Sequence, residues 1–190
     1  MMTRRQSLAV GLGTSLGLLA NRADAQQISG RGRTLVAFFT RSGNTKLIAG
    51  KMRRDLGADL FEIQPAEPYP EDYEATVAQA EREKQAGYEP PLKEPVAEIG
   101  AYSTLYLGFP IWGETTPTVI KSFLSKHDLS GKDLVPLITH GGYGTGDSLA
   151  VLGRLAPQAR LGKAFVIRMD QERAILGDVS RWLEASGSRK

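Results

Sequence analysis

Apolar segments of five to seven residues, each followed by a polar loop and then an amphipathic stretch, recur along this chain. The first runs from Leu35 to Phe39 without a polar residue, which is typical of a strand buried on both faces of a sheet. Further strands are expected over 59–64, 104–109, 134–140 and 164–168. The intervening stretches predict five helices. The first ends at Gly57, the second spans 70–87, and the third starts from an N-cap at Thr116. The fourth spans 148–156, and the fifth starts from a cap at Asp178. This alternation predicts an α/β fold with one parallel sheet covered by helices on both faces.

Length and composition limit the remaining choices. The chain has 190 residues, 41% of them hydrophobic and 24% charged, which suits one globular domain. It contains no Cys. This absence excludes disulfides, a thiolate nucleophile, thiolate-held iron–sulfur clusters and Cys-ligated zinc. Redox chemistry would therefore need a bound cofactor.

Residues 1–25 have the pattern of an export signal. Arg4 and Arg5 precede a thirteen-residue apolar run, and Ala23-Asp24-Ala25 resembles a cleavage site. The run is too short to span a bilayer, so no stable membrane anchor is expected. The paired arginines are similar to twin-arginine signals; a Sec-type signal and a short packed helix are the alternatives. We expect an exported, periplasmic bacterial protein whose folded domain is 26–190.

Charge gives little support for an anionic macromolecular partner. Removing 1–25 takes away three Arg and one Asp, which lowers the formal net charge from +3 to +1. No nucleic-acid motif or patterned basic stripe is present, so no nucleic-acid partner is expected.

In a parallel α/β sheet, ligands bind beyond the carboxyl ends of the strands. The loop after the first strand is rich in hydroxyl and amide groups and runs directly into a helix. Its residues are Thr40, Arg41, Ser42, Gly43, Asn44 and Thr45. Hydroxyls and the N–H groups of a helix N-terminus suit a small phosphate dianion, and the spacing favours a monoester over a triphosphate or pyrophosphate. The alternative is a loop that only turns the chain and caps the helix.

The loop after the third strand contains Pro110, Ile111, Trp112 and Gly113. A Trp at a strand's carboxyl end can cover a flat aromatic ligand by stacking, although it can also plug the edge of the core. Gly113 can reorient its peptide at low cost, so its carbonyl can turn toward a ligand N–H that exists only in a reduced state.

The loop after the fourth strand begins Thr139-His140-Gly141-Gly142-Tyr143. Its glycines allow close approach of backbone to a ligand edge, with Tyr143 as a second aromatic wall; a flexible surface loop is the alternative. His140 is interpreted as structural, not as a proton donor. Together the three loops predict a site for a phosphorylated molecule with a large planar ring.

These motifs resemble the flavodoxin family. The matching segments are Thr40 to Thr45, Phe109 to Gly113, the Thr139-His140-Gly141-Gly142 turn and Pro68 to Tyr73. The resemblance implies a flavodoxin-like three-layer sandwich with a five-stranded sheet in the order 2-1-3-4-5. It also implies flavin mononucleotide (FMN), with phosphate at the first loop and the isoalloxazine between the other two. Two positions depart from a similar subgroup, which often has a second Trp where Gly113 stands and a Ser where Tyr143 stands.

Three functional classes remain open. The first is an FMN-binding electron carrier that docks on a redox partner protein. The second is an FMN-dependent reductase of NAD(P)H:quinone type acting on a small acceptor, although free nicotinamide cofactors are not expected outside the cytoplasm. The third is a ligand-binding module without redox activity. The sequence does not indicate an oligomeric state.

Overall fold

The computed structural model describes residues 32–169 and 172–187, so the predicted export signal lies outside the described residues. The strands are β1 (Arg33–Phe38), β2 (Asp59–Glu62), β3 (Tyr102–Pro110), β4 (Asp133–His140), β5 (Arg160–Leu161) and β6 (Phe165–Arg168). The helices are α2 (Asn44–Leu56), α3 (Tyr73–Ala86), α4 (Thr118–Lys126), α5 (Ser148–Leu155) and α6 (Glu172–Ala185), with a 3₁₀ turn η2 (Ile99–Ala101). Within this part of the chain, no helix is long and apolar enough to cross a membrane.

All strand pairs are parallel, and the sheet has the order β2-β1-β3-β4-β5. The predicted fold and strand order are therefore confirmed. One detail differs, because the outer edge of β4 pairs with two short strands in place of one. Leu134 pairs with Leu161 of β5, while Ile138 pairs with Val166 of β6. The two-residue β5 has too few apolar residues to be expected from the sequence.

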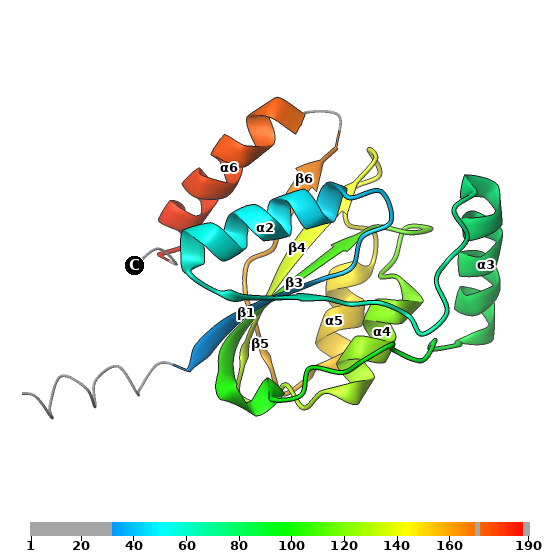
Figure 1. Cartoon of the computed structure of the whole chain (residues 1–190), viewed down its shortest axis with the longest axis horizontal. Helices are drawn as coiled ribbons and strands as arrows, with labels where there is room; N and C mark the ends of the chain where they lie inside the picture. The colour runs from blue at the N-terminus through cyan, green and yellow to red at the C-terminus, as the bar shows by residue number, and fades with distance from the viewer. Residues whose placement is uncertain (1–31, 170–171, 188–190) are drawn as a thin grey trace, which may run out of the picture. The chain divides into compact units, whose positions relative to one another are not determined.

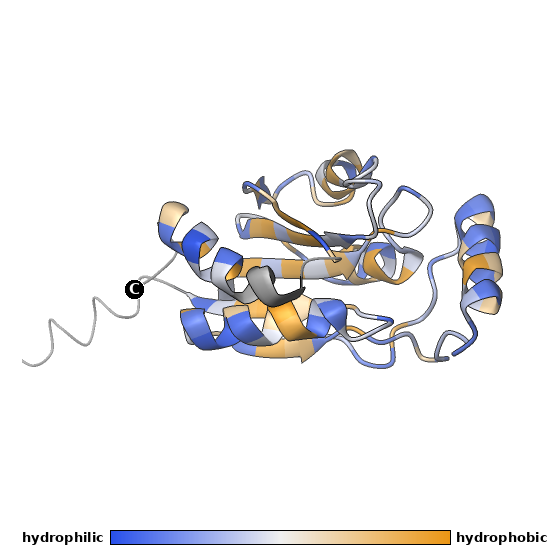
Figure 2. Ribbon diagram, turned by 90° about the horizontal axis from the view of Figure 1, so that it is seen from above, coloured by the Kyte–Doolittle hydropathy of each residue, from blue (hydrophilic) through white to orange (hydrophobic). Residues whose placement is uncertain are grey.

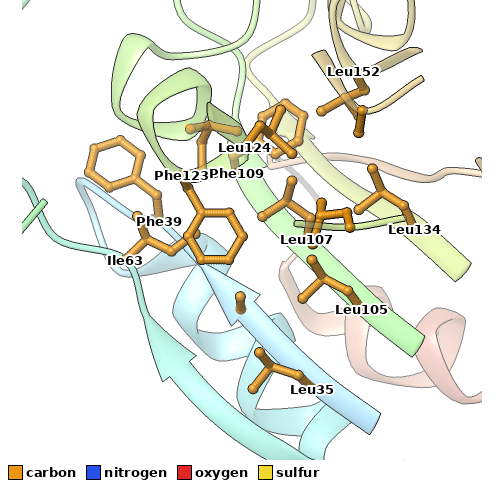
Figure 3. Close-up of a cluster of buried hydrophobic side chains, with 14 of the residues drawn as sticks. Leu35, Phe39, Ile63, Leu105, Leu107, Phe109, Phe123, Leu124, Leu134 and Leu152 are labelled. Atoms are coloured by element: carbon orange, nitrogen blue, oxygen red, sulfur yellow. The ribbon is translucent and has the colours of Figure 1, made fainter. Parts of the chain in front are cut away.

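The sheet separates two apolar cores because successive side chains of a strand point to opposite faces. On one face, Leu35, Leu107 and Phe109 pack with α4 and α5 (Figure 3). On the other, Val36 and Phe38 pack with α2 and α6. Figure 1 shows these helix pairs on either side of the sheet, and Figure 2 shows the hydrophobic strands between them. This is the predicted three-layer sandwich.

Local signals explain most helix ends. Gly57 and Gly87 adopt φ near +60° and end α2 and α3 with backbone N–H bonds to carbonyls of the last turn. Asp72 caps α3 by accepting from the Ala75 N–H at 2.8 Å.

Three predicted helix starts are wrong. Helix α3 begins at Tyr73, after its cap at Asp72, and not at Pro70. The N-cap of α4 is Pro117, not Thr116, because Pro117 itself stays extended (ψ 145°). Helix α6 begins at Glu172, six residues before the predicted cap at Asp178. Gly177 lies inside that helix, where an isolated glycine is tolerated.

Helix α3 does not belong to either covering layer. It stands at the side of the molecule toward which the carboxyl ends of β1 and β3 point (Figure 1). Its buried residues are Thr76 and Glu83, whereas Tyr73 and Val77 are 61% and 45% exposed. A helix that buries so little apolar surface needs polar contacts to hold it in place.

Those polar contacts centre on the Glu83 carboxylate, which is buried. It accepts hydrogen bonds from the Tyr69 hydroxyl at 2.8 Å, from Gln79 Nε2 at 2.9 Å, and from the Thr118 hydroxyl. Burial raises the pKa of Tyr69 above its ordinary value, so the phenol stays protonated and can donate. The Glu83 network therefore fastens α3 to the N-terminus of α4.

Candidate functional site

The carboxyl ends of β1, β3 and β4 open into one cavity of about 340 Å³. This volume falls in the range of small-molecule sites. All three predicted loops contribute to its wall. The predicted residues that line it are Thr40, Arg41, Ser42, Asn44, Thr45, Pro110, Ile111, Trp112, Gly113, Thr139 and Gly141. The structure thus brings together segments about 100 residues apart in the sequence.

The first loop passes directly into the N-terminus of α2. Gly43 has φ 89°, a left-handed conformation that glycine adopts without strain, and α2 starts at Asn44. The Thr40 hydroxyl accepts from the Gly43 N–H at 3.0 Å, which holds the loop closed. The Gly43 carbonyl accepts the first intrahelical bond, from the Leu47 N–H. Gly43 therefore positions the loop without itself lining the cavity, and the N–H groups of the first helical turn are available for an anion.

A buried hydroxyl pair ties this loop to β4. The Oγ1 atoms of Thr45 and Thr139 lie 3.0 Å apart, and both residues are 1% exposed. Since one hydroxyl donates to the other, the acceptor's own proton is left for a further partner. The sequence predicts both residues at the ligand. The structure shows that they also join the loop after β1 to the loop after β4.

Trp112 is half-buried and belongs to an aromatic cluster. Its ring meets Phe39 edge-on at a centroid distance of 5.2 Å and Tyr69 at 4.9 Å. Edge-to-face contacts fix the plane of the indole while leaving part of its surface to the cavity that it lines. Trp112 therefore packs at the edge of the core and also lines the cavity, and its role as a ligand wall stays a prediction.

Trp112 also opens a tight turn. Its N–H and carbonyl exchange hydrogen bonds with those of Thr115, each 3.1 Å long. The two central residues, Gly113 and Glu114, have φ of 52° and 63°. Positive φ at both central positions is the pattern of a type I′ turn, and it is strained for a residue such as Glu114.

The glycine-rich loop packs against this turn at Gly146. The Asp147 N–H donates to the Glu114 carbonyl at 3.1 Å, and a Cβ built on Gly146 would lie 1.7 Å from the same oxygen. Only a residue without a side chain allows this approach. This contact therefore joins the second and third loops, both of which contribute other residues to the cavity wall.

His140 organises the start of the glycine-rich loop. Its Nδ1 accepts from the N–H groups of Gly142 and Gly144 at 3.1 and 3.2 Å. The ring thus has the structural role expected from the sequence. Besides Gly43, two further predicted site residues lie elsewhere: Gly142 is not part of the cavity wall, and Tyr143 is 82% exposed at the loop surface. Tyr143 does not form a second aromatic wall here, because the loop turns its side chain outward.

The opposite wall comes from α3, whereas the alternation of strands and helices predicted only helices that cover the faces of the sheet. Its contributing side chains share one helical face: Tyr73, Thr76, Val77, Ala80, Glu81 and Lys84. The Lys84 ammonium donates to the Gly113 carbonyl at 3.2 Å and lies 3.9 Å from Glu81. The scarcity of large apolar residues on α3 is the sequence signal that could have indicated this position.

Arg41 reaches away from the first loop toward the start of α3. Its guanidinium donates to the Glu71 carbonyl at 3.1 Å and lies 5.2 Å above the Tyr73 ring. It also lines a second cavity, of about 590 Å³, beside β2 and the segment 64–71. Arg41 thus joins the loop to the start of α3 and also lines the first cavity, where the sequence placed it; its contact with a ligand stays a prediction.

A protein-family model described as Flavodoxin matches residues 33–186. The chain belongs to the flavodoxin family. Among solved structures, this chain is similar to a proposed flavoprotein from Bacteroides eggerthii DSM 20697, with 30% identity, a TM-score of 0.70, and coverage of 83% of this chain and 99% of that one. A second proposed flavoprotein, from Bacteroides uniformis ATCC 8492, is 26% identical with a TM-score of 0.72 and coverage of 81% and 99%.

A more distant structure shares the fold. It is a flavoprotein in complex with FMN from Lactobacillus acidophilus NCFM, with 20% identity, a TM-score of 0.62, and coverage of 77% of this flavodoxin and 99% of that chain. A search of curated proteins gave no match.

The cavity's chemistry fits the cofactor expected for a flavodoxin. Hydroxyls and helix N–H groups at one end suit a phosphate dianion, and the Trp112 ring suits a flat aromatic system. In addition, the Thr116 hydroxyl is fully buried beside the cavity, with no hydrogen-bond partner among the described residues. In the same part of the chain, no cluster of three His, Asp or Glu residues could hold a metal ion.

Proposed function

We propose that this chain binds FMN in the cavity and transfers electrons through it. The observation that carries the proposal is that the α2 N-terminal loop and Trp112 line the same cavity. A phosphate site and an aromatic wall in one cavity are what a phosphorylated flavin requires. Family membership supports the same cofactor.

When bound, FMN supplies an isoalloxazine that exchanges one or two electrons. The chain's own residues bind and orient it. Ser42, Asn44 and the α2 N-terminus hold the phosphate, with the helix dipole favouring its negative charge. Trp112 covers the ring and excludes water, which disfavours added negative charge on it. The nearby Lys84 ammonium opposes that effect.

We favour an electron carrier, and the reductase is the second candidate. The exposed Tyr73 and Val77 side chains favour a reductase, because they give the cavity an apolar surface that suits a flat acceptor such as a quinone. Stoichiometric reduction by dithionite, without turnover of NADH or NADPH in the presence of a quinone, supports the carrier. Steady-state consumption of NAD(P)H that depends on quinone would instead identify the chain as a reductase and overturn the carrier. A purified chain that neither binds FMN nor shows a flavin spectrum would overturn both.

We also propose that 1–25 directs export of the chain to the periplasm, where its partner is a redox protein or a small acceptor. The support is the sequence order of paired arginines, apolar run and Ala23-Asp24-Ala25. Cell fractionation and N-terminal sequencing of the recovered protein test it. A mature N-terminus at Gln26 in the periplasm is expected, and an uncleaved cytoplasmic chain would contradict export. Replacing Arg4 and Arg5 by Lys separates the routes, since loss of export indicates the twin-arginine system.

A further inference from the structure

Lys84 lies outside every sequence motif of the site, yet its ammonium holds the carbonyl of Gly113, 29 residues away. The carbonyls of the two neighbouring residues accept backbone hydrogen bonds instead. That of Trp112 accepts from the Thr115 N–H, and that of Glu114 accepts from the Asp147 N–H. Backbone bonds therefore fix both ends of the turn, while a side chain from α3 holds its central carbonyl.

The central peptide of this turn has a second orientation available. Rotating the peptide between Gly113 and Glu114 converts a type I′ turn into type II′, which keeps positive φ at the first central residue but makes φ negative at the second. Gly113 tolerates both forms. Glu114 is relieved of its φ of 63°, a conformation that disfavours a non-glycine residue by roughly tenfold in population. The observed orientation is thus locally strained, and the Lys84 bond stabilises it.

We propose that Lys84 is a latch: it fixes the Gly113 carbonyl through its ammonium and thereby sets the ease of FMN reduction. This inference rests on the proposed function. Uptake of the first electron with a solvent proton creates an N–H on the flavin ring, which the Gly113 carbonyl can accept. Lys84 competes for that carbonyl and keeps the peptide in one orientation. Uptake of the second electron adds negative charge, which the same ammonium stabilises. Lys84 is a positioning residue in the first step and an electrostatic one in the second.

Lys84 is thus expected to lower the potential for the first electron and to raise the potential for the second. Measuring both potentials separates these two effects. In K84M, loss of a charge-assisted bond on a half-exposed side chain favours the first electron by roughly fivefold. This corresponds to a rise of about 40 mV in the first potential at 59 mV per tenfold. The second potential falls. K84R keeps the charge and the donor, and both potentials stay near wild type.

Substitutions at Glu114 give a second, independent test. E114G removes the strain of the latched turn, so it favours the latched orientation by roughly tenfold and lowers the first potential by about 60 mV. E114Q is the matched control, because it also removes the carboxylate charge but keeps the strain. It is expected to leave the first potential unchanged.

The experiment measures both one-electron potentials of the FMN-loaded wild type and the four variants by dithionite titration. In parallel, nuclear Overhauser effects between the Gly113 Hα and the Glu114 N–H are compared in FMN-free wild type and K84M. Opposite shifts of the first potential in K84M and E114G, with a changed Overhauser effect in K84M, support the latch. Unchanged potentials in K84M, shifts of one sign in both variants, or an unchanged Overhauser effect overturn it. Failure of the wild type to bind FMN counts against the proposed function instead, and the FMN-free comparison still decides whether Lys84 holds the turn.

Discussion

The contact between the second and third loops predicts that alanine substitutions at two glycines of one segment differ clearly in their effect on stability. Gly144 and Gly146 both have positive φ, at 73° and 52°. Alanine at either position is therefore strained by about 1 to 2 kcal/mol. A Cβ at Gly144 would meet nothing within 4 Å, whereas a Cβ at Gly146 would lie 1.7 Å from the Glu114 carbonyl oxygen. G144A is consequently a matched control for G146A.

The extra effect of G146A follows from this distance. Non-bonded atoms stay roughly 3.5 Å apart, so the loops must separate by more than 1 Å. That separation breaks the bond from the Asp147 N–H to the Glu114 carbonyl, which contributes about 1 kcal/mol, and loses local packing as well. We expect G146A to be less stable than G144A by about 1 to 2 kcal/mol. Since both loops contribute residues to the cavity wall, the FMN dissociation constant should rise about tenfold.

Urea unfolding of the FMN-free proteins measures the stability difference, and quenching of FMN fluorescence measures the affinity. Equal stabilities of G144A and G146A would refute the packing argument. A stability difference without a change in FMN affinity would show that the contact between the two loops does not shape the cofactor site.

Three other perturbations test separate parts of the structure. N44A should weaken FMN binding several-fold while leaving riboflavin binding unchanged, because we propose that Asn44 contacts only the phosphate; equal losses for both ligands in fluorescence titrations would contradict this. E83A leaves the Tyr69 and Thr118 hydroxyls without their buried acceptor, so it should lower the free energy of unfolding by about 2 to 3 kcal/mol, and an effect below 0.5 kcal/mol in urea unfolding would argue against the fastening of α3. Burial lowers the pKa of His127, whose Nε2 accepts from the Val96 N–H. The unfolded chain thus binds the proton more tightly, and stability should fall as pH drops below about 6.5. H127Q should flatten this slope in unfolding curves between pH 7 and 5, and an unaltered slope would assign it to other groups.

The parts of the fold that were predictable depend on local signals. The apolar run from Leu35, the loop from Thr40 to Thr45 and the cap at Gly57 specify β1, the first loop of the cavity and α2 within 25 residues. Parallel topology then places the other two loops at the same edge of the sheet, so their convergence could be expected before any coordinates.

The position of α3 could not be predicted in this way. Its apolar residues Tyr73, Val77 and Ala80 follow a helical period, which indicates a buried face but not the surface that it meets. The Glu83 network and the Lys84 bond decide its place, and both join residues about 30 positions apart. The outward turn of Tyr143 has a local origin instead, because the N–H groups of Gly142 and Gly144 donate to the nearby His140 ring and direct the course of the loop.

The central claim is that three loops form one site for a phosphorylated flavin, and comparing FMN with riboflavin tests it most directly. Fluorescence titration of the purified chain with each ligand should give a stoichiometry of one and an FMN affinity at least tenfold higher than that for riboflavin, since only FMN engages the α2 N-terminus. Equal affinities for the two ligands, or FMN fluorescence that the protein does not change, would contradict the account.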